Sequence, residues 1–367
     1  MSGSSIDTPN EFEIFNGGNL VSRNVLIFTE HINATYFISF DIPLRRLHAR
    51  GEVNFSVISQ KHVQSKGFRC WERWAVIFRP NVVVLTRYSQ PHGPEILDFF
   101  HRQGIPVIYH IDDNLLEIPD SLGAEILQRQ GAKEIVEARR YLLSNCDLIY
   151  ASTDYLADEL QRCFPTQQVF RGIYAPYMGD DIQAAHHQER SYPVVGYMGS
   201  KGHKHDLELV VPTLERLLDE RGNLQFEVFG TVKMPSKLER FGRRVRSHSV
   251  QKSYVEFLAK LSELNWSVGL APLVDAPFNR CKAPTKFIEY SACWIPVIAS
   301  DSLPYSNVIP EDGGRLVKHD WHAAISEFLD QPGLRKHAIE NARSYCQSTF
   351  PVNALIDQLT CIFRLVA

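Results

Sequence analysis

The feature that most constrains the fold is a repeated alternation of short apolar runs with longer stretches of helical character. In the first part of the chain, apolar runs of strand length are separated by segments whose apolar residues recur at helical spacing. Strands joined by helices pair in parallel, and the helices then cover both faces of the sheet. The predicted strands are 24–29, 54–58, 82–85, 106–111 and 148–151, and the predicted helices are 36–50, 94–103, 131–145 and a segment capped at 152–155 that ends near 162.

A polar stretch at 177–192 interrupts this alternation, and the pattern then begins again. The second series has predicted strands at 194–198, 225–229, 267–271 and 296–299, and predicted helices at 206–221, 254–263, 286–293, 321–330, 334–349 and 353–365. A chain of 367 residues has room for two domains. We therefore predict an α/β protein with two Rossmann-like domains, 1–178 and 193–350, whose parallel sheets face a cleft, with a linker over 179–192 and a final helix over 351–367.

Charge, cysteines and termini narrow the class of protein. The formal net charge is -3, which gives no general attraction to nucleic acid or to an acidic membrane. The 7 cysteines include no Cys-x-x-Cys pair and the histidines show no zinc-ligand spacing, so we expect reduced thiols and no metal. Residues 1–18 lack the apolar run of a signal peptide, and no window holds the ~20 apolar residues that span a membrane. These features favour a cytoplasmic protein.

The turn at 196–206 joins a predicted strand to a predicted helix and is a candidate phosphate site. Gly199 and Gly202 allow a ligand to approach the backbone, and the helix start offers free N–H groups. Ser200, Lys201 and Lys204 add donors and charge, and His203 is a further donor. The Walker spacing is absent. The alternative is an ordinary tight turn between strand and helix.

The segment 271–300 is a second candidate, since a strand here enters a polar loop and then a helix. The loop holds Asn279, Lys282 and Thr285, and lysines at 282 and 286 can neutralise a pyrophosphate. Glu289 lies one helical turn beyond Thr285 and Lys286, where a carboxylate can accept two hydrogen bonds from a ribose diol. The alternative is a surface ion pair between Lys286 and Glu289.

These motifs resemble the donor-binding signature of GT-B glycosyltransferases, in particular the GT4-like group (glycosyltransferase group 1) of bacterial surface polysaccharide biosynthesis. The resemblance rests on Lys-Phe-Ile-Glu-Tyr at 286–290, Pro-Val-Ile-Ala-Ser at 296–300, the segment 264–273 and Gly-Tyr-Met-Gly-Ser at 196–200. It implies that Glu289 is the second glutamate of an E-x7-E motif and binds the donor ribose. The position of the first glutamate holds Cys281. The final helix of this fold crosses back to the first domain.

A third motif, Tyr-His-Ile-Asp-Asp-Asn-Leu at 109–115, follows a predicted strand of the first domain. Ligands of open α/β sheets bind beyond the carboxyl ends of strands. The resemblance implies transfer without a bound metal, so we assign Asp112 and Asp113 to the acceptor, where an aspartate orients a hydroxyl or acts as a base. His110 and His31 are assigned to the same acceptor site. The alternative is an Asx turn or helix cap.

The resemblance thus implies a hexosyltransferase that moves a sugar from a nucleotide-sugar donor to a glycan or lipid-linked acceptor, with retention and without cofactor. Two other functions remain open, a nucleotide-sugar epimerase and a non-catalytic nucleotide-binding protein. The expected catalytic residues are Asp112, Asp113, Lys286 and Glu289, and the expected donor-binding residues are Gly199, Ser200, Lys201, His203, Asn279, Lys282, Thr285, Lys286 and Glu289.

A basic run at 233–252 is the last charged feature. It contains several lysines and arginines but only one aromatic residue, Phe241, which argues against nucleic acid as a partner. A run of this kind is typical of a solvated helix face. The alternative is attraction to anionic lipid, which would bring the protein to the inner face of a membrane as a peripheral protein.

Overall fold

The computed structural model describes residues 12–15, 23–66, 69–174, 177–179, 182, 190–249 and 253–366. Most of the linker predicted over 179–192 lies outside the described residues. The chain forms two compact units. Unit 1 consists of Met1–Ile118, Leu127–Tyr174 and Asn353–Ala367, and unit 2 consists of Pro119–Ile126 and Ala175–Val352. The domain limits therefore differ from the prediction chiefly at Pro119–Ile126, which belongs to unit 2.

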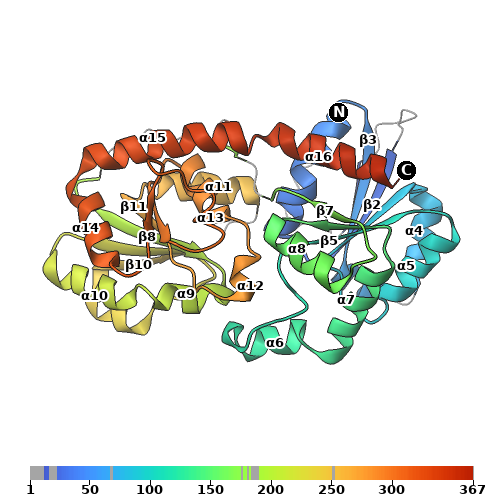
Figure 1. The fold of residues 1–367 in the computed structure, drawn as a ribbon, viewed down its shortest axis with the longest axis horizontal. Helices are drawn as coiled ribbons and strands as arrows, with labels where there is room; N and C mark the ends of the chain where they lie inside the picture. Colours follow the sequence, from blue (N-terminus) through green and yellow to red (C-terminus); the bar gives the residue numbers. More distant parts are fainter. Residues whose placement is uncertain are drawn as a thin grey trace. The chain divides into compact units, whose positions relative to one another are not determined.

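Unit 1 is built on a sheet whose strands run in the order β1-β3-β2-β4-β5-β6-β7 (Figure 1). Six of these strands are parallel: β2 (Arg23–Thr29), β3 (Val53–Ser59), β4 (Val82–Thr86), β5 (Val107–Ile111), β6 (Leu148–Ala151) and β7 (Val169–Arg171). Strand β1 (Phe12–Phe15), which the sequence did not predict, pairs antiparallel with β3 at the edge of the six parallel strands. The order reverses at β2, which places the switch point between β2 and β4.

Helices cover both faces of this sheet. One face packs against α1 (Ala34–Tyr36), the π-helical turn η1 (Phe37–Asp41), α2 (Ile42–Ala49) and the C-terminal helix α16 (Val352–Leu365). The core on that face includes Val25, Phe40 and Leu359. The other face packs against α4 (Cys70–Phe78) and α5 (Gly93–Arg102), where Phe28 contacts Trp74 and Phe100. The remaining helices are α3 (Gln60–Lys66), η2 (Asp120–Leu122), α6 (Ala124–Gln130), α7 (Lys133–Asn145) and α8 (Asp154–Cys163).

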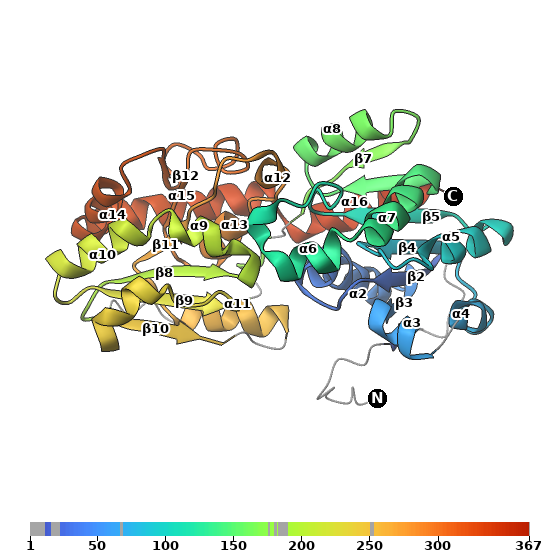
Figure 2. The same ribbon diagram turned by 90° about the horizontal axis from the view of Figure 1, so that it is seen from below.

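Unit 2 has a fully parallel sheet in the order β10-β9-β8-β11-β12-β13, the strand order of dinucleotide-binding folds (Figure 2). Its strands are β8 (Val194–Gly199), β9 (Gln225–Gly230), β10 (Val245–His248), β11 (Val268–Ala271), β12 (Val297–Ser300) and β13 (Arg315–Val317). Its helices are η3 (Lys201–His203), α9 (Lys204–Glu208), α10 (Val211–Glu220), η4 (Ser236–Arg244), α11 (Tyr254–Glu263), α12 (Pro277–Arg280), α13 (Thr285–Ala292), α14 (Trp321–Asp330) and α15 (Pro332–Thr349).

The two faces of the unit 2 sheet are packed differently. One face joins Val195 and Tyr197 of β8 to the apolar sides of α10 and α14 in a single core. On the opposite face Gly196 lies so close to Trp266 that a Cβ atom there would stand 1.8 Å from the indole ring. Only glycine permits this approach. The predicted helix 206–221 is divided into α9 and α10, with Pro212 near the start of α10.

No helix among the described residues is long and apolar enough to cross a membrane. All 7 cysteines are free thiols, and four of them, Cys146, Cys281, Cys293 and Cys346, are buried.

Candidate functional site

The first candidate site is the region beyond the carboxyl ends of β8 and β11 in unit 2, called the crevice below because open α/β sheets bind their ligands in a crevice at this place. The strand order reverses between these two strands, and ligands of open α/β sheets bind at such a switch point. The pairing of β8 with β11 is recorded at Val195 and Gly196 only. Beyond it, the Tyr290 hydroxyl accepts a hydrogen bond from the Met198 amide (3.0 Å) and donates one to the Leu270 carbonyl (3.1 Å). Tyr290 thus fills the gap where the strands separate.

Helix α13 begins beside this crevice and carries both residues that the sequence singled out most strongly. No side chain caps the helix at Pro284, so the free N–H groups of its first turn are left for solvent or a ligand. Lys286 and Glu289 are each only 8% exposed. The alternative of a surface ion pair between Lys286 and Glu289 is therefore wrong, because both side chains are buried.

Burial perturbs both charges. It raises the pKa of Glu289 to about 7, although a hydrogen bond from the Tyr254 hydroxyl (2.9 Å) and the charge of Lys286 act in the opposite direction. Burial also lowers the pKa of Lys286 to about 8, with attraction by Asp206 opposing it and repulsion by Lys282 adding to it. The Lys286 ammonium lies 5.5 Å from the centre of the Tyr197 ring. A buried cation of this kind gains most when an anion binds beside it.

Asp206 organises the loop that follows β8, and it was not among the residues predicted from sequence. Its Oδ2 lies 2.9 Å from Nδ1 of His203, and its Oδ1 accepts from the Val274 amide at 3.0 Å and from the Asn279 side chain at 3.5 Å. These bonds join the loop after β8 to the loop after β11. Burial, followed by the charge of Lys286, lowers the pKa of His203 to about 4, so the ring is neutral at pH 7.

The other predicted donor residues lie around this crevice at different depths. Asn279 and Thr285 are half-buried, and so is Lys282, whose ammonium lies 4.7 Å from the centre of the Phe278 ring. Cys281 is fully buried, and its thiol donates to the Pro277 carbonyl. At the position where the resemblance places a sugar-binding glutamate, the chain therefore has a thiol that solvent does not reach.

Gly199 ends β8, and Ser200 and Lys201 are exposed beyond it. A Cβ atom at Gly199 would lie 3.2 Å from the Tyr197 ring, so a larger residue would be crowded at this turn. The Lys201 amide donates to the Thr231 hydroxyl at 3.1 Å, while its ammonium extends toward Glu125 at 3.9 Å. Of the cationic side chains predicted for the donor phosphates, Lys286 is the one buried at the crevice.

A second cluster of charges lies at the carboxyl ends of β2, β4 and β5 in unit 1, and its centre is Arg87. The Arg87 guanidinium contacts Asp112 at 2.8 Å, Glu30 at 3.2 Å and Asp113 at 3.4 Å. Burial by itself lowers the pKa of Arg87, yet these three carboxylates raise it above its ordinary value. The backbone of Arg87 has φ 53°, a left-handed conformation that costs about 1 kcal/mol and persists where the surroundings enforce it.

The two predicted aspartates differ in their surroundings. Asp112 is buried, and its second oxygen accepts a hydrogen bond from Thr35 at 2.8 Å, so both oxygens have partners. The Asp113 side chain is 21% exposed and touches Arg87 by its longer contact. Asp112 is therefore placed to hold the cluster together, and Asp113 is the one with access to solvent.

The two histidines predicted for the acceptor site also differ in burial. His110 has no exposed surface, and its ring nitrogens lie 2.8 Å from the Thr86 hydroxyl and 3.2 Å from the Ser152 hydroxyl. Burial, followed by the charge of Arg87, lowers its pKa to about 3. His110 is thus a neutral core residue and does not contact an acceptor, which corrects the sequence-based assignment. The His31 side chain is 49% exposed and lies 3.5 Å from Glu30.

Arg87 and Glu30 were missed by the sequence reasoning. Glu30 directly follows β2 and Arg87 directly follows β4, the two strands that flank the switch point of unit 1. A charged residue one threonine beyond an apolar run was the available signal in both cases. Glu30 also accepts from Gln130, whose side-chain oxygen accepts in turn from the buried Arg139 at 2.7 Å. Among the described residues, no group of three or more His, Cys, Asp or Glu side chains is arranged to hold a metal ion.

No model of a known protein family and no curated protein sequence matches the chain. Solved structures do match it. HepE from Anabaena, in complex with UDP-glucose, aligns over 93% of this chain and 99% of its own with 11% identity and a TM-score of 0.62. WaaG, a glycosyltransferase involved in lipopolysaccharide biosynthesis, aligns over 92% and 99% with 14% identity and a TM-score of 0.60.

A further match is TarM from S. aureus, at 14% identity and a TM-score of 0.53. It covers 78% of this chain, but the chain spans only 55% of TarM. At these identities the likeness concerns the fold. The two sheets, their strand orders and these matches together show that the chain has the two-domain α/β fold of GT-B glycosyltransferases.

Proposed function

We propose that the protein is a glycosyltransferase that binds a nucleotide-sugar at the unit 2 crevice and transfers the sugar to an acceptor. The observation that carries this proposal is the pair of buried, oppositely charged side chains of Lys286 and Glu289 on a helix that begins at the switch point. Three matching structures support it, since HepE is in complex with UDP-glucose, an α-glucosyltransferase with UDP, and TarM with UDP and α-GlcNAc-glycerol.

The chemistry follows from where charge develops. When the bond between the sugar and the diphosphate breaks, negative charge grows on the departing nucleoside diphosphate. The Lys286 ammonium and the positive end of α13 stabilise that charge, and they do so strongly because the lysine is buried. Glu289 accepts hydrogen bonds from the ribose diol. An acceptor hydroxyl attacks the anomeric carbon and loses its proton, so the products are a glycoside, a nucleoside diphosphate and a proton.

The finer assignments follow the resemblance. We propose a hexosyltransferase of the GT4-like group that acts with retention and without a catalytic metal or cofactor in surface polysaccharide biosynthesis. Its acceptor is a glycan or a lipid-linked glycan, and the protein is cytoplasmic with peripheral contact at the inner face of the membrane. In unit 1 we place the acceptor at Asp113, whose side chain is partly exposed, and at the exposed His31, while Asp112 and Arg87 position that edge.

The donor assignment is tested by binding of UDP, GDP, dTDP and ADP to the purified chain. We expect at least one nucleoside diphosphate to bind, and Lys286→Ala to weaken it by about 10- to 100-fold, the value of a hydrogen bond to a charged group. Binding to the native protein should weaken as the pH rises past about 8, because Lys286 then loses its proton. The Lys286→Ala protein should lack that step. Absence of binding across all four nucleotides refutes the donor site.

Cys281 supports a second candidate, a nucleotide-binding protein without transferase activity. Its buried thiol stands where the resemblance places a sugar-binding glutamate. Such a protein binds nucleoside diphosphate with the same dependence on Lys286 but forms no product with any acceptor. Mass spectrometry of products, with donor alone and with an acceptor mixture, distinguishes the two. It also detects an epimerase, which converts the donor when no acceptor is present.

A further inference from the structure

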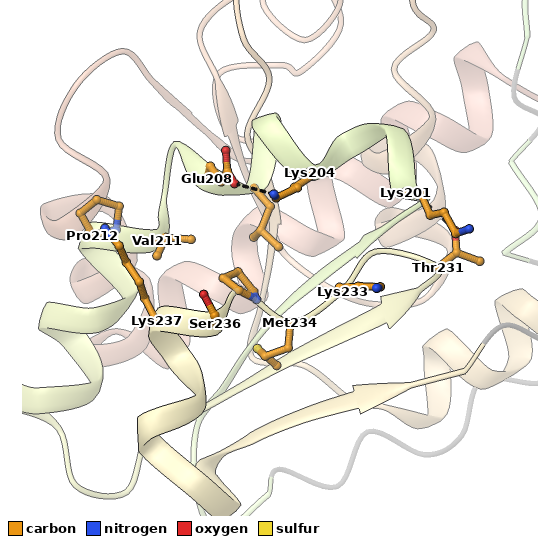
Figure 3. Close-up of a pocket in the computed structure, with 12 residues that line it drawn as sticks. Lys201, Lys204, Glu208, Val211, Pro212, Thr231, Lys233, Met234, Ser236 and Lys237 are labelled. Atoms are coloured by element: carbon orange, nitrogen blue, oxygen red, sulfur yellow. Dashed lines mark hydrogen bonds and ion pairs between the residues drawn. The ribbon is translucent and has the colours of Figure 1, made fainter. Parts of the chain in front are cut away.

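A cavity of about 730 Å³ lies in unit 2, beside the loop that follows β8 but on the α9–α10 side of it (Figure 3). Four lysines line it: Lys201, Lys204, Lys233 and Lys237. Lys286, Glu289, His203 and Asp206 do not line it. The cavity is therefore separate in its lining from the crevice assigned to the donor, and its volume suits a ligand of nucleotide size.

The loop that follows β8 contributes residues to both places. His203 and Asp206 bond to each other and to the loop after β11, on the Lys286 side. Lys201 and Lys204 instead line the cavity, together with residues of the segment after β9 (Figure 3). The sequence predicts one phosphate site for Lys201, Lys204 and His203, whereas of these three only the two lysines line this cavity.

The charge in the cavity is strongly one-sided. Of the described residues that line it, Glu208 is the only acidic one, and it pairs with Lys204 at 3.5 Å. Lys201 lies 3.9 Å from Glu125, which does not line the cavity. Within the described residues, no ion pair is recorded for Lys233 or Lys237. Val211 and Pro212 begin helix α10 at the cavity, and the first turn of that helix has no acidic residue. The positive end of the helix dipole therefore adds to the lysine charges.

The basic run at 233–252, which the sequence predicts as one solvated helix face, also consists of two sets of residues with different surroundings. Arg240 pairs with Asp219 of α10 through both of its terminal nitrogens, at 3.0 Å and 2.5 Å, and Arg244 donates to the Leu218 carbonyl at 2.7 Å. These arginines fasten η4 to α10. Lys233 and Lys237, at the start of the run, line the cavity instead. Lys252, at its end, lies outside the described residues.

The lining between the lysines is partly apolar. Leu207 and Val211 are buried beneath it, and Met234 and Pro235 are half-buried at its side. Cations arranged around apolar surface fit a ligand that combines phosphate with an apolar body. We propose that this cavity is a second anion site, which binds a phosphorylated ligand independently of the donor crevice.

The test uses the full chain, with inorganic pyrophosphate as the soluble probe. Lysine acetylation followed by mass spectrometry reports which ammonium groups the probe covers. We expect pyrophosphate to protect the four cavity lysines in the native protein and equally in Lys286→Ala. In the double variant Lys233→Glu, Lys237→Glu we expect its affinity to fall by about 10-fold or more, since each reversal replaces attraction by repulsion.

A matched control is Lys336→Glu, which reverses an exposed lysine of α15 that does not line the cavity. This variant should bind pyrophosphate as the native protein does, and thermal unfolding of each variant verifies that it is folded. A second arm measures binding to phosphatidylcholine vesicles with and without phosphatidylglycerol. Binding that needs the anionic lipid and is lost in the double variant identifies a lipid headgroup as the source of the phosphate.

Two results overturn the proposal. One is that neither probe protects the four lysines. The other is that the double variant binds the probe as tightly as the native protein. If pyrophosphate protects Lys286 alone and its binding disappears in Lys286→Ala, the donor crevice stands and the second site does not.

Discussion

Glu289 gives the sharpest test of the donor crevice, because the burial of its carboxylate lowers the free energy of unfolding. Its pKa is raised from 4.5 to about 7 in the folded protein. An acid whose pKa is raised by folding destabilises the folded state above that pKa, since ionisation is easier in the unfolded chain. The cost is absent below pH 4.5 and complete above about pH 7. The displacement corresponds to about 3 kcal/mol.

The substitution Glu289→Gln removes this cost but keeps an oxygen to accept the Tyr254 hydrogen bond. Part of the gain is lost, because Lys286 then lacks the attraction of the carboxylate. We expect a net stabilisation of about 2 kcal/mol above pH 7, or roughly 4–8 °C in the melting temperature of a domain of this size. Nucleoside diphosphate binding should weaken in the same protein, because a neutral amide accepts weaker hydrogen bonds from a ribose.

The assay is differential scanning calorimetry of the native and Glu289→Gln proteins at about pH 4.5 and about pH 8, which follows the transition of unit 2 in the intact chain. The two proteins should melt together at the lower pH and separate at the higher one, with the variant more stable. A variant that is less stable by the same amount at both pH values would refute the reasoning, because Glu289 would then be a structural residue.

Two further predictions concern residues whose surroundings contrast with those of a neighbour. Asp112→Asn should destabilise unit 1 by about 2 kcal/mol in thermal unfolding, because Arg87 loses its shortest ion pair. Asp113→Asn should lower the stability by less than about 1 kcal/mol. Equal losses in the two variants would contradict the distinction between these aspartates. Gly196→Ala should cost about 3 kcal/mol in denaturant unfolding, because the added carbon collides with an indole ring, while Gly222→Ala meets nothing within 4 Å and should unfold as the native protein does.

The fold could be predicted where strands are apolar and central. The runs at 82–85 and 148–151 are the buried cores of β4 and β6, since parallel strands covered on both faces read as continuous hydrophobic segments. Strand β10, Val-Arg-Ser-His at Val245–His248, was not predicted because it lies at a sheet edge, where its two central residues are exposed and the outer two half-buried. The antiparallel direction of β1 depends on its partner strand, and a pattern within one strand carries no information about that.

The site could be predicted in part for a similar reason. Lys286 and Glu289 were found because their spacing and neighbours form a motif. His110 was misassigned, because a strand covered on both faces buries a polar side chain as fully as its apolar neighbours, and Arg87 was missed because it belongs to no motif. Lys201 was predicted together with the donor residues but lines the cavity beside α9 and α10, since the direction of a side chain in a short turn is set by the turn itself.

The hydroxyl of Tyr290 has a consequence for how such a site changes over time. The ring that keeps β8 and β11 apart, the cation and the carboxylate all belong to α13, within one and a half turns of helix. A shift of that helix by mutation elsewhere moves the opening and its charged groups together. The opening and its charged groups are therefore inherited as one part, and substitutions in the surrounding loops can alter the proposed sugar specificity without disturbing it.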